Sequence, residues 1–231
     1  MKKILFLIIV GVGTVLAATS VPAATFTYNL GVEYSGGTEP AGDPPWLTAV
    51  IEDVAANTVR ITMSTSGLTA SEFVSGWYFN WDFEFADLDP VDGITLLPIS
   101  TEPFAPITFG TNNLDADGIL GHGFDILFNF PTASPDDRFE ANEIAAYEFM
   151  GNSSSTLSAS SFNYLNAEGN FYSAAHVQAI NGTGAEYPND DSGWIGATES
   201  ISPIPEPATI LLLGTGLASL FGIRRYRFTK K

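Results

Sequence analysis

The chain has 231 residues, of which 26 are acidic and nine are basic, and it contains no cysteine. The absence of cysteine excludes disulfides, thiolate zinc sites and thiol nucleophiles. The strong excess of acidic residues argues against nucleic-acid binding, which needs clustered Lys and Arg to neutralise phosphates. The charge is also unevenly distributed, because seven of the nine basic residues lie near the two ends. Residues 25–203 hold 25 acidic residues, two arginines and no lysine, which gives this segment a net charge of −23.

The first 24 residues have the organisation of a secretory signal peptide. A lysine pair at residues 2–3 precedes an apolar run over residues 4–16, and Val21 and Ala23 fit the −3 and −1 positions of a cleavage site. Cleavage after Ala23 or after Ala24 is expected, and the small residues Ala18-Thr19-Ser20 form a second candidate site. An uncleaved anchor is the alternative, but the run is shorter than the about 20 residues that a spanning helix needs. We therefore expect export through the Sec translocon.

Residues 25–194 are predicted to form one acidic β-sandwich domain. Apolar residues alternate with polar ones in several short runs, as in strands that bury one face. These runs cover residues 26–34, 59–64, 80–85, 124–130 and 172–180. Stretches rich in Gly and Pro, such as 36–45 and 89–93, separate them as turns or loops. The pattern indicates a mainly β fold, with a single antiparallel sandwich of jelly-roll-like type.

Three shorter segments complete the predicted domain organisation. Residues 70–74 and 142–150 are predicted to form short helices within the domain. Residues 195–203 are predicted to form a short stalk between the domain and the C-terminal segment.

The strongest candidate for a metal site is the sequence Asn-Leu-Asp-Ala-Asp-Gly at residues 113–118. It matches the opening of a calcium-binding loop, with oxygen ligands at positions 1, 3 and 5 and glycine at position 6. The match fails at position 12, where Phe124 replaces the bidentate glutamate. The segment is therefore either an Asx-type turn between strands or a looser calcium site. The calcium ligands would be Asn113, Asp115, Asp117 and Asp125.

Aromatic and acidic residues suggest two ways of handling a carbohydrate. Trp46 and Trp194 lie in loop-like surroundings and are the candidates for stacking on a sugar ring. Asp82 and Glu84 share one face of a predicted strand, about 7 Å apart, and a secreted hydrolase would use such a pair of carboxyl groups. A solvated strand face is the simpler interpretation of this pair. His176 is expected to be a hydrogen-bonded core residue and not a ligand.

Residues 204–231 contain three elements in a fixed order. The first is a short extended segment, the second is an apolar helix predicted over residues 208–223, and the third is a basic cluster. Because proline disfavours helix in the residue before it, the helix should begin after the second proline. The basic cluster predicts a cytoplasmic end by the positive-inside rule. The residues of the first and third elements are Pro205, Glu206, Pro207, Arg224, Arg225 and Arg227.

These three elements resemble the PEP-CTERM sorting signal of Gram-negative bacteria. In that family an exosortase, a membrane enzyme with a catalytic cysteine, recognises and processes the tail. Such proteins are exported and are associated with exopolysaccharide or extracellular matrix. The resemblance implies that this chain is the substrate of a sorting enzyme and is held in the membrane only as a precursor. A plain C-terminal anchor is the alternative, although an anchor does not need the Pro-Glu-Pro segment.

The sequence therefore predicts a non-catalytic, exported protein of the cell surface or extracellular matrix, sorted through its tail and associated with exopolysaccharide. A glycan-binding, lectin-like module is one alternative, and a secreted carbohydrate-active hydrolase is another. Calcium is the one cofactor that the sequence suggests.

Overall fold

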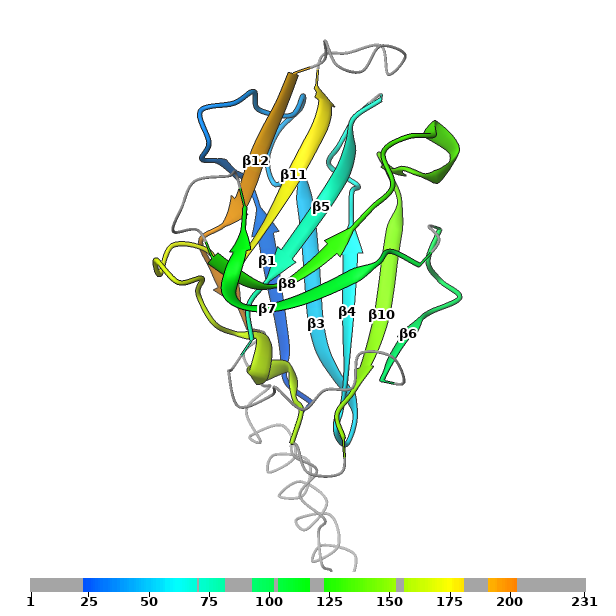
Figure 1. Ribbon diagram of the computed structural model, residues 1–231, viewed down its shortest axis with the longest axis vertical. Helices are drawn as coiled ribbons and strands as arrows, with labels where there is room; N and C mark the ends of the chain where they lie inside the picture. Colours follow the sequence, from blue (N-terminus) through cyan, green and yellow to red (C-terminus); the bar gives the residue numbers. More distant parts are fainter. Residues whose placement is uncertain are drawn as a thin grey trace, which may run out of the picture.

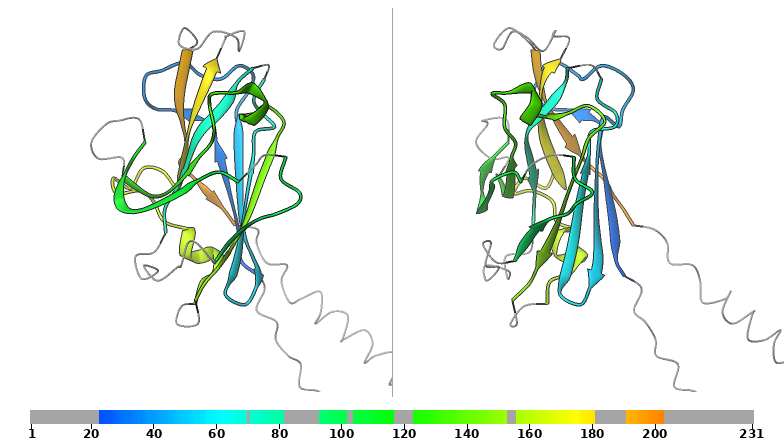
Figure 2. Two further views of the ribbon diagram at one scale, coloured as in Figure 1. Left: turned by 45° about the vertical axis from the view of Figure 1, so that its right-hand side comes forward. Right: turned by 90° about the vertical axis from the view of Figure 1, so that its right-hand side faces the viewer.

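The computed structural model describes residues 23–69, 71–81, 93–101, 104–116, 123–152, 156–180 and 191–202. These residues form two antiparallel sheets that pack face to face as a sandwich (Figures 1 and 2). The predicted mainly β, antiparallel sandwich is thus confirmed. Within the described ranges, helical structure is limited to two short 3-10 segments, η2 (Pro135–Asp137) and η3 (Ala159–Phe162).

One sheet has six strands, and the other has seven. The order of the six-stranded sheet is β13-β1-β3-β4-β10-β6. Its strands are β13 (Ser200–Ile201), β1 (Thr25–Leu30), β3 (Leu47–Ala55), β4 (Thr58–Ser64), β10 (Ile144–Met150) and β6 (Ile94–Leu96). The order of the seven-stranded sheet is β2-β12-β11-β5-β8-β7, with β9 beside β5. Its strands are β2 (Val32–Glu33), β12 (Asp191–Ala197), β11 (Ser173–Ile180), β5 (Phe73–Phe79), β8 (Gly123–Asn129), β7 (Ile107–Asp115) and β9 (Phe139–Glu140).

The main hydrophobic core lies between the two sheets. In β4 the alternation predicted from the sequence is confirmed, because Val59, Ile61 and Met63 are fully buried while the residues between them are not. Phe128 of the seven-stranded sheet packs against Tyr147 of the six-stranded sheet, with 4.9 Å between ring centroids. Burial of such aromatic rings supplies much of the free energy that holds the two layers together.

The two predicted helices and the predicted stalk are wrong. Residues 144–150 form β10, which is hydrogen-bonded between β4 and β6. Phe73 begins strand β5, so residues 73–74 are extended and not helical. In the segment expected to be a stalk, Ile195 is fully buried in β12 and residues 200–201 pair with β1. The sheets therefore extend to Ile201.

The first and last strands of the domain lie side by side. Thr27 of β1 pairs with Ile201 of β13 in antiparallel register. Both ends of the described domain therefore leave the sandwich at the same end (Figure 2). In the ranges that the structure describes, no helix has the length and apolar character needed to cross a membrane. The apolar run 4–16 and the predicted helix 208–223 fall outside those ranges.

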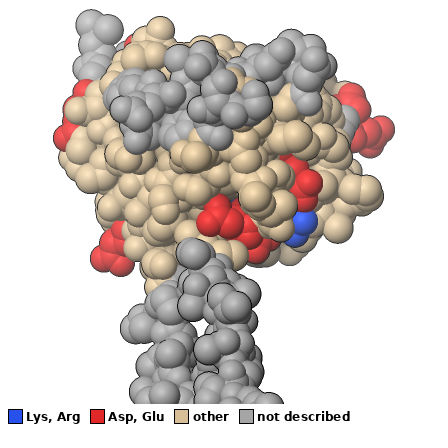
Figure 3. Space-filling view, turned by 90° about the horizontal axis from the view of Figure 1, so that it is seen from below, with Lys and Arg blue, Asp and Glu red and all other residues tan. Residues whose placement is uncertain are grey.

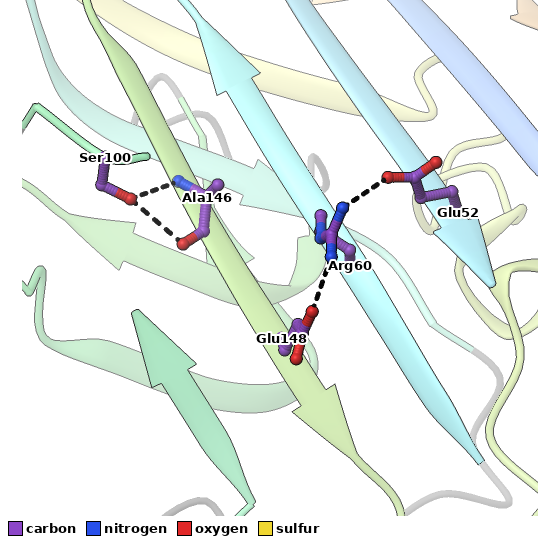
Figure 4. A network of polar contacts seen from close by, with 5 residues as sticks. All are labelled: Glu52, Arg60, Ser100, Ala146 and Glu148. Atoms are coloured by element: carbon purple, nitrogen blue, oxygen red, sulfur yellow. Dashed lines mark hydrogen bonds and ion pairs between the residues drawn. The ribbon is translucent and has the colours of Figure 1, made fainter. Parts of the chain in front are cut away.

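The outer face of the six-stranded sheet carries a three-residue ion network (Figure 4). Arg60 of β4 lies between Glu52 and Glu148 on the flanking strands, with nitrogen–oxygen distances of 3.3 and 2.8 Å. Ser100 extends the hydrogen bonding of β10 beyond β6, since its hydroxyl bonds both backbone groups of Ala146. Viewed from below, acidic side chains lie at several places on the described surface, with basic atoms beside some of them (Figure 3).

Candidate functional site

The residues predicted to form a calcium loop are not arranged as a loop in the part that the structure describes. Asn113 and Asp115 belong to strand β7, and Asp117 lies outside the described residues. The side-chain oxygen of Asn113 accepts a hydrogen bond from the backbone N–H of Thr111 at 3.1 Å. Among the described residues, no group of three or more His, Cys, Asp or Glu side chains is placed to hold a metal ion.

Asp125, the fourth expected calcium ligand, is buried, with 1% of its surface exposed. Its two carboxylate oxygens accept hydrogen bonds from the backbone N–H groups of Trp81, at 3.1 Å, and Asn112, at 2.7 Å. Burial raises the pKa of this carboxyl group, and the two hydrogen bonds partly oppose that shift. In this arrangement Asp125 links the end of β5 to β7 and uses both oxygens for protein contacts.

The two tryptophans predicted to be exposed differ in their surroundings. Trp46 is 3% exposed and belongs to the main core, where its indole N–H donates to the carbonyl of Gly42 at 3.2 Å. The expectation of an exposed Trp46 is therefore wrong. Trp194 is half-buried on the outer face of the seven-stranded sheet, where it lines a pocket. The acidic pair of Asp82 and Glu84 lies outside the described residues.

The pocket beside Trp194 is built by one row of residues that crosses four strands. His176 of β11 is the direct neighbour of Trp194 on β12 and of Gly76 on β5. Gly76 in turn pairs with Asn129 of β8. Because glycine has no side chain, the row has a gap at Gly76, and the side chains of Tyr78 and Leu127 border this gap closely. The pocket has a volume of about 400 Å³. It belongs to the seven-stranded sheet, which is the front layer in Figure 1.

A second pair of cross-strand neighbours borders the pocket next to Gly76. Tyr78 and Leu127 are cross-strand neighbours and both line the pocket. Burial, and then the nearby charge of Asp115, raise the pKa of Tyr78, so its hydroxyl stays protonated at neutral pH. A Cβ added at Gly76 would meet Tyr78 Cε2 at 3.2 Å and Leu127 Cδ1 at 3.3 Å. Any larger side chain at Gly76 would fill the floor of the pocket.

His176 forms the wall between Trp194 and the gap. Its ring stacks on the indole of Trp194, with centroids 4.5 Å apart and an interplanar angle of 16°. Its Nδ1 atom lies 2.9 Å from the hydroxyl of Ser75 and 3.2 Å from the side-chain nitrogen of Gln178. With Gln178 as the donor, Nδ1 is an acceptor, so the neutral ring carries its proton on Nε2. Burial lowers the pKa of His176 to about 4, which keeps the ring neutral at physiological pH.

Ser75 reaches His176 because of an irregularity in strand pairing. His176 pairs with Gly76 while Val177 pairs with Val74, so Ser75 is the extra residue of a β-bulge. A bulge changes the direction of a side chain and often occurs beside functional sites. Here it brings the Ser75 hydroxyl within hydrogen-bonding distance of the imidazole.

Two polar contacts at the borders of the pocket fix its shape. The Glu33 carboxylate accepts hydrogen bonds from the backbone N–H groups of Ser35, at 2.9 Å, and Trp194, at 3.4 Å. Although burial opposes ionisation, hydrogen bonds including these hold the pKa of Glu33 below its usual value. On the opposite rim, the buried guanidinium of Arg138 donates to the carbonyl of Thr132 at 2.9 Å and lies over the ring of Phe73.

The pocket has the chemistry of a site for an uncharged ligand. Of the described residues that line it, none is Asp, Glu, Lys or Arg. The polar groups are a serine, a threonine, an asparagine and a neutral histidine, and the apolar groups are mostly aromatic. The lining residues are Ser75, Gly76, Tyr78, Leu127, Asn129, Phe130, Pro131, Thr132, His176 and Trp194.

Sequence reasoning identified one member of this site and missed the others. Trp194 was expected, but the expected core position of His176 is wrong, because its ring lies on the outer face and lines the pocket. Nothing in the sequence indicates that Gly76 and Asn129 are neighbours, since strand register decides this. The one available signal was Gly76 itself, because an isolated glycine in a strand often marks a bulge or a close approach.

A comparison with protein-family models finds one match, the PEP-CTERM protein-sorting motif, over residues 203–226. The chain therefore carries this sorting motif at its C-terminal end, as predicted from the sequence. The matched residues include Pro205, Glu206 and Pro207 and two of the three arginines, Arg224 and Arg225, while Arg227 follows one position after the match. All of them lie outside the described residues. No curated protein and no solved structure matches the chain, and the β-sandwich is not assigned to any family.

The motif implies that the protein is exported and is sorted by an exosortase. It says nothing about what the sandwich does after sorting.

Proposed function

We propose that this protein is a non-catalytic component of the cell surface or extracellular matrix that binds a neutral glycan, such as a segment of exopolysaccharide. The pocket above Gly76 would hold the glycan, and the sorting motif would deliver the domain to its place of action. The observation that carries this proposal is the row formed by Trp194, His176, Gly76 and Asn129.

The shape of the row suits a sugar ring. One face of the His176 ring is covered by Trp194, and the row continues on its other side over Gly76. A pyranose over Gly76 would place its apolar C–H groups against an aromatic wall that the stacked indole keeps in position. Ligand pockets commonly combine such aromatic walls with a few polar groups that fix orientation.

The polar groups of the pocket suit hydroxyl groups. Nε2–H of His176 is a donor, and the side chains of Asn129 and Thr132 each offer both a donor and an acceptor. Asn129 and Thr132 are exposed, so they are accessible to a ligand in the pocket. A sugar hydroxyl can also donate and accept, so each of these groups can be paired.

The charge of the domain favours a neutral polymer over an acidic one. Residues 25–203 carry a net charge of −23, which repels uronic acids or sulfated sugars over the length of a long chain. The pocket itself offers no cation among its described lining residues. A neutral polysaccharide is not repelled by the acidic domain and needs no cation in the pocket.

The proposal is tested with mature protein isolated from an exporting host. Affinity electrophoresis is run in gels that contain a neutral polysaccharide such as dextran, a β-glucan or a galactomannan, with alginate as the acidic comparison. Retardation is expected in at least one neutral gel and not in alginate. Trp194→Ala should weaken binding about tenfold, equivalent to ~1.4 kcal/mol. Asn129→Ala, at an exposed position, should weaken binding without affecting the fold.

Phe104→Ala is the matched control, because Phe104 is exposed and does not line the pocket. This variant should bind like the wild type. Absence of binding to every neutral polymer, or equal binding by the Trp194 and Asn129 variants, would contradict the glycan proposal. Reducing ends are measured in the same mixtures over time, and their steady release by the wild type would overturn the non-catalytic part.

A further inference from the structure

The Asp53 carboxylate binds the backbone of Ala24, which lies at the expected border between the signal peptide and the mature domain. Its Oδ2 atom accepts a hydrogen bond from the backbone nitrogen of Ala24 at 3.0 Å. The backbone N–H of Asp53 donates to the carbonyl of Ala24, also at 3.0 Å. Ala24 precedes β1, yet both of its backbone polar groups are bonded to one residue of β3.

Asp53 is itself fixed from a second direction. Its Oδ1 atom accepts a hydrogen bond from the backbone N–H of Ala159 at 2.6 Å, at the start of η3. A cleft of about 460 Å³ surrounds this point, and Asp53 is the one charged side chain among the described residues that line it. Ala23, at the border of the cleft, is exposed, whereas Ala24 packs against the core. The boundary between exposed and packed chain thus falls between Ala23 and Ala24.

We propose that signal peptidase cuts between Ala23 and Ala24, and that the new α-ammonium group of Ala24 forms an ion pair with Asp53. In this hydrolysis a water molecule supplies the hydroxyl that turns the Ala23 carbonyl into a carboxylate, and the released Ala24 nitrogen becomes an ammonium group. The sequence allows this site, because Val21 and Ala23 fit the −3 and −1 positions. A cut after Ala24 would remove both hydrogen bonds to Asp53.

Cleavage changes the charge of the donor while keeping its position. Before the cut the donor is an amide N–H 3.0 Å from the carboxylate oxygen, and after the cut the same nitrogen would be a cation. An opposite charge at this distance raises the pKa of an α-amino group above its usual value of about 7.7–8.0. The stabilisation is present below that usual value and is lost as the pH rises through the raised pKa. The neighbouring charge on β3, Glu52, is paired with Arg60.

The composition of the chain makes this amine easy to observe. Lysine occurs only at positions 2, 3, 230 and 231. After removal of the signal peptide and of the sorting tail, the α-amine is the sole primary amine of the protein. If the tail is retained, its two lysines add two primary amines, and intact mass shows that they are present.

The experiment uses protein processed by an exporting host. Intact-mass spectrometry and N-terminal sequencing identify the first residue, which should be Ala24. The amine is then labelled by reductive methylation with ¹³C-formaldehyde, which preserves its charge, and titrated by NMR. We expect an α-amine pKa about one unit higher in the wild type than in Asp53→Asn. Asp136→Asn, which removes the same charge from an exposed 3-10 segment, is the matched control and should titrate like the wild type.

A second measurement leaves Asp53 intact. Acetylation of the α-amine removes its charge but keeps an N–H donor. It should lower the melting temperature of the wild type by about 2 °C and should leave that of Asp53→Asn unchanged. A first residue other than Ala24, or an α-amine pKa that is equal in the wild type and Asp53→Asn, overturns the proposal. The inference depends on export alone, so a failure of glycan binding leaves it standing.

Discussion

The outer faces of the two sheets are built differently. On the six-stranded sheet, the row through Arg60 is Glu52, Arg60 and Glu148, in which one cation is shared by two carboxylates. On the seven-stranded sheet, the row through His176 is aromatic, open at Gly76 and free of formal charge. The two faces therefore differ in charge although they belong to the same acidic domain.

This difference shows how a strongly acidic domain can keep an uncharged pocket on one face, as the proposed binding of a neutral glycan requires. A high net charge keeps a protein soluble but acts at a distance on every charged ligand. On the six-stranded sheet, part of that charge is paired locally with one of the domain's two arginines. On the seven-stranded sheet, the described residues that line the pocket are uncharged, so a neutral ligand would desolvate no charged group among them.

The largest expected effect comes from the core that both faces share. Phe128 is fully buried and contacts both Tyr147 and Phe149 of the opposite sheet. Phe128→Ala should lower the free energy of unfolding by about 3–5 kcal/mol, measured by guanidinium denaturation. Phe104→Ala, with 48% of the side chain exposed, should cost less than about 1 kcal/mol. A similar cost at both positions would mean that the layers are not joined through Phe128.

The next effect concerns the buried arginine beside the pocket. Arg138 is 7% exposed, donates to the Thr132 carbonyl and lies 4.3 Å from the ring centroid of Phe73. Arg138→Met keeps an apolar stem but removes the cation and its hydrogen bonds. We expect a loss of about 2–3 kcal/mol in unfolding free energy and weaker glycan binding through the rim at Thr132. An unchanged melting curve would contradict this role.

The third effect is a pH dependence of stability that comes from His176 on the seven-stranded sheet. The pKa of His176 is about 4 in the folded protein because the ring is buried, whereas an unfolded histidine titrates near about 6.5. Between these values the unfolded chain binds more protons, so stability falls as the pH drops from about 6.5 to 4. Because the ring is only half-buried, we expect about 1–2 kcal/mol after allowance for solvent screening.

His176→Gln isolates this contribution from that of the many carboxylates. The difference in unfolding free energy between wild type and variant should change over this pH range and be constant above about pH 7. A difference that is independent of pH would show that His176 has an ordinary pKa and is solvated.

The smallest effect is expected on the charged face. The side chains of Arg60, Glu52 and Glu148 are each about one-third exposed, at 32%, 35% and 30%. Arg60→Gln should therefore cost less than about 1 kcal/mol at low salt. The cost should largely disappear at about 1 M NaCl, where the Debye length is about 3 Å. A loss that persists in high salt would indicate a packing role for the guanidinium stem.

The sequence predicts the strands well where one face is buried and the other is solvated. Residues 59–64 show this, because Arg60 and Thr62 point away from the core that Val59 and Ile61 enter. It fails where both faces are covered. In β10 the run Ala145-Ala146-Tyr147 is buried throughout, and its alanines have high helix propensity. Pairing with β4 and β6 overrides that preference.

The pocket was less predictable than the fold because it depends on register. His176 and Trp194 are 18 positions apart, and Gly76 lies 100 positions before His176. A shift of one residue in β11 would point His176 into the core. Trp46 was predicted to be exposed because it follows Pro44-Pro45 in a loop-like segment. In the structure its indole is buried in the core and donates to the carbonyl of Gly42.

The pairing of β1 with β13 has a consequence for the timing of folding during export. Thr27 and Ile201 are paired although 174 positions separate them. The six-stranded sheet is therefore incomplete until nearly the whole domain has crossed the membrane, and until then β1 is an unpaired edge that can join another chain. Closing such a distant contact is slow compared with local hairpins. A chain truncated before residue 200 would lack β13 and would leave this edge of β1 unpaired. The six-stranded sheet can therefore be complete only after the full domain has been exported.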